Sequence, residues 1–422
     1  MAQTRVQQAL SLLKPFDQLD YHEQRRINHL KLQFPYDDRL TTHLELLHLP
    51  KLLPYLVWVP FGNFRDVRQL AKSGFSNVWK GTIRSFMDVE GKVNNEVFAL
   101  KEIDGSMLQE VVLNAVVAVH NYMNFISMIG LSKHEETGKY LMIMEYAELG
   151  SLEQQLVSTT EVGSWQHIYK MAYSICYDLA QLHSVGLVHN NLHPGNIVFK
   201  NHKYGSRIVD IGLAKVIGEH LAENTAEQEG FYGRLAYLPP ECFNGEPYTS
   251  ASDIYCLGTI MWQLVSHVPP RGTAGEIFRA DRRREDPVPG TPPEFQNVID
   301  SCWKLNPVNR PRAEKVLGYL FKLKKAIEAR ESTSRFLFNY FRRNRVRPTR
   351  ATKVHVANLV ANHRKHIVTN VNKYFGNYNT DPTDFTSQGA SQESSFHVSQ
   401  YYGAQQLARF SQYSAFTNFE KE

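Results

Sequence analysis

The hydrophobic pattern of this chain changes its period near Gly150. Over residues 63–147 the apolar residues fall in short runs typical of β-strands, interrupted by one helix-like stretch at 107–122. Over residues 148–330 the spacing is mainly helical. A small β-rich lobe followed by a larger α-rich lobe predicts an α+β, bilobal fold with a cleft between the lobes.

Three further segments flank the two lobes. Residues 1–62 predict a helical N-terminal extension, since leucines recur at helical intervals between prolines. Within it, the apolar stretch Leu52–Val59 predicts a buried helix or packing segment. Residues 331–375 predict a basic helical segment. Residues 376–422 are rich in Ser, Gln, Asn, Thr, Gly and Tyr and show no hydrophobic period, which predicts a disordered tail.

The net charge of +5 comes from one stretch of the chain. Between Arg335 and Phe375 there are ten Lys or Arg and no Asp or Glu, and the remainder has 37 basic against 42 acidic residues. Such a run is most often a solvated surface. Its functional alternative is a surface that binds nucleic acid or an anionic membrane.

Cysteine usage and hydropathy indicate the compartment. The four cysteines lie far apart without C-x-x-C spacing, which argues against a zinc site and against a disulfide framework. No signal-peptide pattern and no run of about 18 apolar residues occurs. We therefore expect a reducing compartment, the cytoplasm or the nucleus.

The octet His189–Asn196, which reads His-Asn-Asn-Leu-His-Pro-Gly-Asn, has the spacing of a known catalytic loop. The motif H-R-D-L-x-x-x-N contains an Asp that accepts the proton of a substrate hydroxyl, followed by an Asn that holds magnesium. Here the position of that Asp is Asn191. An amide has no basic lone pair near neutral pH, so Asn191 can orient a hydroxyl but cannot deprotonate it.

With these residues and an ordered series of further motifs, the chain from Asn63 to about Ala329 resembles a eukaryotic protein kinase domain. Its nearest resemblance is to the tyrosine-kinase-like branch and its fungal expansions. The further motifs, in chain order, are Ala99-Leu100-Lys101, Met144-Glu145-Tyr146-Ala147, Asp210-Ile211-Gly212, Pro239-Pro240-Glu241, Asp253 to Gly258, and Cys302-Trp303 to Arg310-Pro311. The resemblance implies that Glu241 and Arg310 form a buried ion pair and that Asp253 braces the catalytic loop.

The resemblance also implies a site for ATP and Mg²⁺. Lys101 would contact the α- and β-phosphates, and Asn196 and Asp210 would be the magnesium ligands. The adenine ring would lie between apolar side chains and against the hinge backbone, formed by Val78, Ala99, Val198, Glu145 and Ala147.

The loop expected to cover the phosphates is poor in glycine. In the family it reads G-x-G-x-x-G, because glycine lets backbone N–H groups approach phosphates closely. Here Ala71, Ser73 and Ser76 stand at the glycine positions, and only Gly74 remains, one position out of register. We expect this close approach to be weakened.

Active kinases pair the strand lysine with a glutamate on the following helix. Leu108-Gln109-Glu110 resembles the family pattern there and favours Glu110. Counting back from Gly130 with the usual helix length instead gives 112–115, where no acid stands. The two registers exclude each other, because Ala115 lies about 140° around the helix from Glu110.

Three functions are compatible with these residues. The first is an ATP-binding pseudokinase with little or no phosphotransfer, acting as a scaffold or allosteric regulator of signalling proteins. The second is a weakly active, atypical kinase that phosphorylates Ser, Thr or Tyr of proteins with Mg-ATP. The third is a nucleic-acid or anionic-membrane adaptor acting through 335–375. Asn191, together with the loop substitutions and Asn190 in place of the usual Arg, favours the first.

Overall fold

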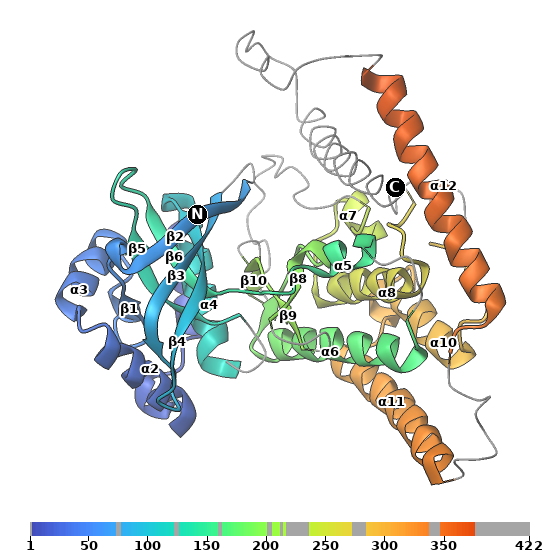
Figure 1. Ribbon diagram of the computed structural model, residues 1–422, viewed down its shortest axis with the longest axis horizontal. Coiled ribbons are helices and arrows are strands. Elements are labelled where there is room, and N and C mark those ends of the chain that lie inside the picture. The colour runs from blue at the N-terminus through green and yellow to red at the C-terminus, as the bar shows by residue number, and fades with distance from the viewer. Residues whose placement is uncertain are drawn as a thin grey trace, which may run out of the picture.

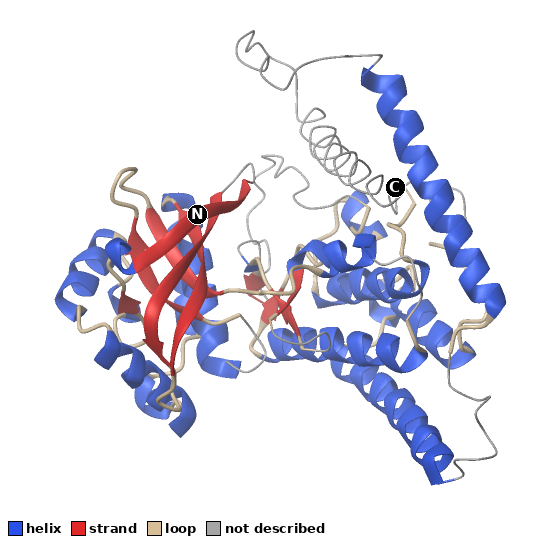
Figure 2. Cartoon of the chain, in the orientation of Figure 1, coloured by secondary structure: helices blue, strands red, loops and turns tan. Residues whose placement is uncertain are grey.

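The computed structural model describes residues 2–72, 77–121, 126–158, 163–200, 205–211, 214–216, 236–271, 284–336 and 347–375. A lobe built on a β-sheet is followed by a lobe made mainly of helices (Figure 1). Helices also flank the large sheet of the first lobe, and the second lobe contains only short strands among those described (Figure 2). The predicted α+β, two-lobed fold is confirmed.

The first lobe is a six-stranded sheet with the order β1-β5-β6-β4-β3-β2. Its strands are β1 (Val57–Trp58), β2 (Phe64–Lys72), β3 (Asn77–Met87), β4 (Val93–Ile103), β5 (Met128–Lys133) and β6 (Tyr140–Glu145). Strand β4 lies between β3 and β6, and its Phe98 and Leu100 are buried in the core on one face of the sheet. Because side chains alternate along a strand, Ala99 and Lys101 point to the opposite face.

The N-terminal extension contains the expected helices α1 (Ala2–Ser11), α2 (Tyr21–Gln33) and α3 (Asp37–Leu46). Of the two alternatives for Leu52–Val59, the helix is wrong, because a 3-10 helix ends at Leu52 and Val57 and Trp58 form strand β1, parallel to β5. The other alternative, a packing segment, is confirmed by the burial of most of its side chains. β-Branched and aromatic residues such as Val57 and Trp58 favour the extended state. A Cβ on Gly130 would lie only 2.0 Å from the Val57 carbonyl oxygen, so glycine is what lets the two backbones pair. The extension therefore shares its sheet with the first lobe.

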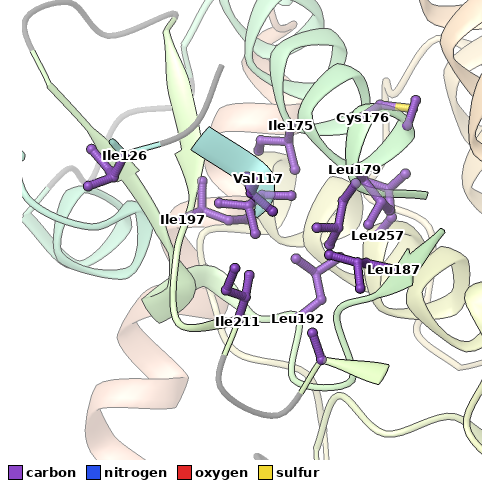
Figure 3. Packing of buried hydrophobic residues seen from close by; sticks show 14 of the residues in the cluster. Val117, Ile126, Ile175, Cys176, Leu179, Leu187, Leu192, Ile197, Ile211 and Leu257 are labelled. Carbon is purple, nitrogen blue, oxygen red and sulfur yellow. The ribbon is translucent and has the colours of Figure 1, made fainter. Parts of the chain in front are cut away.

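One helix of the first lobe, α4 (Leu108–Asn121), follows β4. Its bounds agree closely with the helix predicted over 107–122. Its middle turns are almost fully buried, from Val111 to Val119. Figure 3 shows Val117 of α4 in one cluster with Ile197, Ile211 and Leu257 of the second lobe. The hydrophobic core therefore continues from one lobe into the other beneath the predicted cleft.

The second lobe is built around a nearly buried helix, α8. Its helices are α5 (Leu152–Ser158), α6 (Trp165–Ser184), α7 (Pro240–Phe243), α8 (Ser250–Ser266), α10 (Pro293–Cys302) and α11 (Ala313–Phe336). Two short strand pairs join them, β7 (Leu187–Val188) with β10 (Lys215–Val216) and β8 (Ile197–Phe199) with β9 (Ser206–Ile208). The 3-10 helices among the described residues are η1 (Phe16–Gln18), η2 (Pro50–Leu52), η3 (Phe61–Asn63), η4 (Gly105–Met107), η5 (Pro194–Asn196) and η7 (Pro307–Asn309).

The predicted basic segment 331–375 is divided between two helices. Helix α11 runs on to Phe336, beyond the expected lobe boundary at 330. Helix α12 (Arg350–Phe375) docks on the second lobe, where buried Thr352 donates a hydrogen bond from Oγ1 to the Pro289 carbonyl at 2.7 Å. Residues 337–346 and the tail lie outside the described residues. Binding of nucleic acid or an anionic membrane by this segment stays a prediction.

Two general expectations concern the whole chain. All four cysteines are buried and free, as expected for residues with a packing role. Among the residues that the structure describes, no helix is both long enough and apolar enough to span a membrane.

Candidate active site

Three charged residues predicted for the nucleotide site lie together, because Lys101 forms an ion pair with Glu110 and another with Asp210. Its Nζ lies 2.5 Å from Glu110 Oε1 and 2.9 Å from Asp210 Oδ1. Strand β4 supplies the lysine, the first turn of α4 supplies Glu110, and Asp210 follows β9 with a φ of 62°. The alternative helix register does not hold, because Val112 and Ala115 are buried in the apolar core.

The ion pairs hold Lys101 and Asp210 in their charged forms, whereas burial raises the pKa of Glu110 above its ordinary value in spite of Lys101. Burial favours the neutral form of Lys101, but the carboxylates of Glu110 and Asp210 outweigh it and raise the lysine pKa above its ordinary value. Burial likewise favours protonated Asp210, yet the Lys101 charge and hydrogen bond lower the pKa of Asp210 below its ordinary value. At neutral pH the structure therefore holds a cation and a partly exposed carboxylate side by side.

The catalytic-loop octet begins at a buried histidine. The backbone N–H groups of His189 and Asn190 donate to the two Asp253 carboxylate oxygens, at 2.8 and 3.2 Å. The His189 ring donates from Nε2 to the Val209 carbonyl at 3.1 Å and accepts at Nδ1 from the Asn191 N–H at 3.2 Å. His189 is fully buried and both ring nitrogens are used, so it holds the loop in place and does not act as a base.

Asp253 is the anchor of this loop, as the resemblance implies. Its carboxylate also accepts hydrogen bonds from His183 Nε2 at 2.9 Å and from the Tyr248 hydroxyl at 2.7 Å. Burial alone would raise the pKa of Asp253, but the hydrogen bonds from His183 and Tyr248 help to lower it below its ordinary value. Sequence reasoning missed His183 and Tyr248. The one available signal for His183 was its position six residues before His189, in the helix that leads to the loop.

Asn191 occupies the acid position in a well-defined backbone. Its N–H is held by His189, and its carbonyl accepts from Asn196 Nδ2 at 3.0 Å. Within the described part of the chain, the Asn191 side chain makes no hydrogen bond. The neighbouring Asn190 adopts a left-handed φ of 64°, a conformation that asparagine tolerates better than most residues.

The two predicted magnesium ligands belong to one hairpin. Strands β8 and β9 pair Ile197 with Ile208, and the Val209 N–H donates to the Asn196 carbonyl at 2.9 Å. Asn196 therefore precedes one strand and Asp210 follows the other. The Asn196 amide nitrogen is used by Asn191, which leaves its amide oxygen as the ligand atom. An amide oxygen and an ionised carboxylate are ligands that Mg²⁺ accepts, so the donor set fits Mg-ATP.

The predicted adenine residues lie on strands that flank the hinge. Val78 is paired with Lys101, and Ala99 with Met144. Three of the predicted residues are partly buried against the same core cluster: Ala99, Ala147 and Val198. Ser73, Gly74 and Ser76 lie outside the described residues, and only the backbone of Ala71 is described, paired with Val78.

Ser127, Lys200 and Lys80, which lie outside the predicted set, contact the predicted hinge residues. The Glu145 carboxylate accepts from the Ser127 N–H at 3.2 Å and from Lys200 Nζ at 2.8 Å. Lys80 Nζ lies 4.4 Å from the centre of the Tyr146 ring, within cation–π distance. These long-range contacts had no local sequence signal. They position the hinge backbone without contributing a reacting group.

A buried ion pair closes the second lobe, as the resemblance implies. Arg310 donates from two guanidinium nitrogens to the two Glu241 oxygens, at 2.6 and 2.7 Å. Both side chains are almost completely buried. Ser252 Oγ adds a third donor to Glu241, at 2.8 Å. The Pro239-Pro240-Glu241 motif is thereby tied to the start of α11.

A profile of the protein tyrosine and serine/threonine kinase family matches residues 64–320. The chain belongs to this family. Three similar proteins come from Dictyostelium discoideum. A probable serine/threonine-protein kinase is 26% identical over 215 residues, which are 50% of this chain and 15% of that protein. A probable LIM domain-containing serine/threonine-protein kinase is 24% identical over 272 residues, 63% of this chain and 39% of that protein.

The third relative, a dual specificity protein kinase, is 28% identical over 195 residues, 42% of this chain and 25% of that protein. The chain therefore spans well under half the length of these relatives. The similarity lies in the kinase domain.

Proposed function

We propose that this protein is a pseudokinase of the tyrosine-kinase-like branch. It binds Mg-ATP in the cleft, transfers the phosphoryl group slowly or not at all, and acts as a scaffold or allosteric regulator for other signalling proteins. The supporting observation is a contrast within one site. Lys101 contacts both Glu110 and Asp210, whereas the position of the proton acceptor carries the amide of Asn191.

Most of these residues would bind ATP or its metal, whereas the residue at the position of the catalytic base is Asn191. Bound Mg-ATP would supply the phosphoryl group. Lys101 would neutralise phosphate charge, with Glu110 holding the lysine, while Asn196 and Asp210 would hold the metal. Asn191 would face the substrate hydroxyl and orient it, but its amide would not accept the proton.

The two deficits of this site, in the base and in the loop, together favour little or no phosphotransfer. General-base catalysis contributes roughly 10²- to 10⁴-fold, about 3 to 5 kcal/mol of barrier. Most phosphoryl-transfer catalysis is positioning and charge stabilisation. The glycine positions occupied by Ala71, Ser73 and Ser76 weaken the positioning as well, so the two deficits add in the same direction.

Thermal unfolding of the full chain with and without Mg-ATP tests the binding. A ligand at about 100 times its Kd should add about 2.7 kcal/mol of stability, a rise of several degrees in Tm for a domain of this size. Lys101→Met should abolish the rise. Lys92→Met removes an exposed lysine in the β3–β4 hairpin and should leave the rise intact. No rise for the unmodified chain at millimolar Mg-ATP would remove nucleotide binding from the proposal.

The second candidate is a weakly active protein kinase. It is favoured by the Lys101–Glu110 contact, since that ion pair is needed in active kinases. The names of the relatives describe serine/threonine and dual specificity kinases, which suggests protein hydroxyls as the acceptor class. Phosphoryl transfer above that of Lys101→Met separates this candidate from the pseudokinase.

A further inference from the structure

Helix α1 of the N-terminal extension packs directly on α4, the helix that carries Glu110. The inner face of α1 includes Ala9, which has no exposed surface, and Leu10, which is 7% exposed. Its outer face includes the exposed Gln7. The contact is therefore a one-sided apolar interface, of the kind that fixes one helix against another.

The end of α1 is tied down by hydrogen bonds. The Leu12 carbonyl accepts from His120 Nε2 at 3.0 Å, and the Lys14 carbonyl accepts from the Tyr55 hydroxyl at 2.6 Å. His120 stands in the last turn of α4, whereas Tyr55 lies just before β1. Two carbonyls of the segment that follows α1 thus accept hydrogen bonds, one from α4 and one from the segment that enters the sheet.

The same end of α1 reaches the second lobe. Leu12 Cδ2 lies 3.9 Å from the position that a Cβ on Gly186 would take, ordinary van der Waals contact distance. Gly186 has a φ of 80° and forms the turn between α6 and β7, three residues before His189. Leu12 therefore stands where α4, the extension and the turn before the catalytic loop come together.

The position of α4 decides whether Glu110 reaches Lys101. Glu110 lies in the first turn of α4 and His120 in the last. A helix moves as a stiff rod, so restraint at the His120 end also limits the swing of Glu110. In kinases the placement of this helix is a point of control. Here the restraint is supplied within the chain.

We infer that helix α1 positions α4 so that Glu110 remains in contact with Lys101. The positioning residues are Ala9 of α1 and His120 of α4. Its effect on nucleotide affinity rests on the proposed function. Its effect on α4 itself does not.

The test uses the full chain with Ala9→Arg, which places a charge in the α1–α4 interface. Amide hydrogen exchange of residues 108–121 should rise at least about tenfold relative to α8, because local opening lowers protection. The Kd for Mg-ATP should rise about tenfold. Gln7→Arg, with the same charge on the outer face, should change neither. Unchanged exchange in α4, or a rise equal to that in α8, would overturn the inference.

A second pair of variants tests the inference independently, in case Ala9→Arg does not fold. His120→Leu removes the donor to Leu12 and should raise α4 exchange and the Mg-ATP Kd by a few fold, whereas His120→Gln keeps a donor and should restore both. Equal behaviour of the two variants would contradict the positioning role. If the unmodified chain binds no Mg-ATP, the proposed function fails, but the exchange measurements still decide whether α1 holds α4.

Discussion

Replacing Asn191 with Asp is expected to raise phosphoryl transfer by about 10²- to 10⁴-fold over the unmodified chain. Asp is nearly isosteric with Asn, and the backbone of residue 191 is held on both sides, by His189 and by Asn196. The new carboxylate would therefore occupy the place of the amide and accept the hydroxyl proton. Single-turnover transfer from γ-labelled ATP to a generic protein substrate measures the gain.

Asn190→Asp is the matched control for that gain. It introduces the same charge one residue earlier, where the backbone has a left-handed φ and the side chain leaves in another direction. We expect no increase from it. The double change Asn191→Asp with Lys101→Met should also stay at background. If Asn191→Asp is no faster than the unmodified chain, the missing base is not what limits this site.

Replacing Arg310 with Met is expected to reduce the free energy of unfolding by about 3 to 5 kcal/mol. The change leaves the Glu241 carboxylate buried, and among the described residues Ser252 is then its one remaining side-chain donor. It also removes the bonds from the guanidinium to the Lys304 and Ala251 carbonyls, at 2.7 and 3.0 Å. Urea unfolding followed by far-UV circular dichroism measures the loss.

A surface ion pair supplies the control for this loss. Lys31 Nζ lies 2.9 Å from Asp37 Oδ1, comparably close, but the Asp37 side chain is 57% exposed. Lys31→Met should therefore change stability by less than about 1 kcal/mol. The paired change Glu241→Met with Arg310→Met should recover part of the loss, because no unpaired charge remains. Equal effects of Arg310→Met and Lys31→Met would show that the buried pair does not hold the second lobe.

Short ordered motifs predicted some of the residues that the fold brings together. Lys101, Asp210 and Asn196 stand within such motifs, and the structure brings Asp210 to Lys101. The glutamate that pairs with Lys101 could be assigned only from the structure, because a helical period alone allows two registers. The ion pair at 2.5 Å selects Glu110.

The remaining features depend on contacts between distant segments. A two-residue strand such as Val57–Trp58 has no detectable period, and its pairing with β5 is set by the space above Gly130. The contact of His120 with Leu12 joins residues 108 positions apart. No local pattern predicts such a contact, because the tertiary fold decides which carbonyl meets which donor.

The most direct test of the nucleotide-binding pseudokinase is incubation of the full chain with Mg²⁺ and γ-labelled ATP. Bound nucleotide and protein-attached label are then measured in the same sample, beside Lys101→Met. The account predicts that the unmodified chain retains intact ATP, that Lys101→Met retains none, and that neither carries more label than the other. Protein-attached label above the level of Lys101→Met would contradict the account and identify an active kinase.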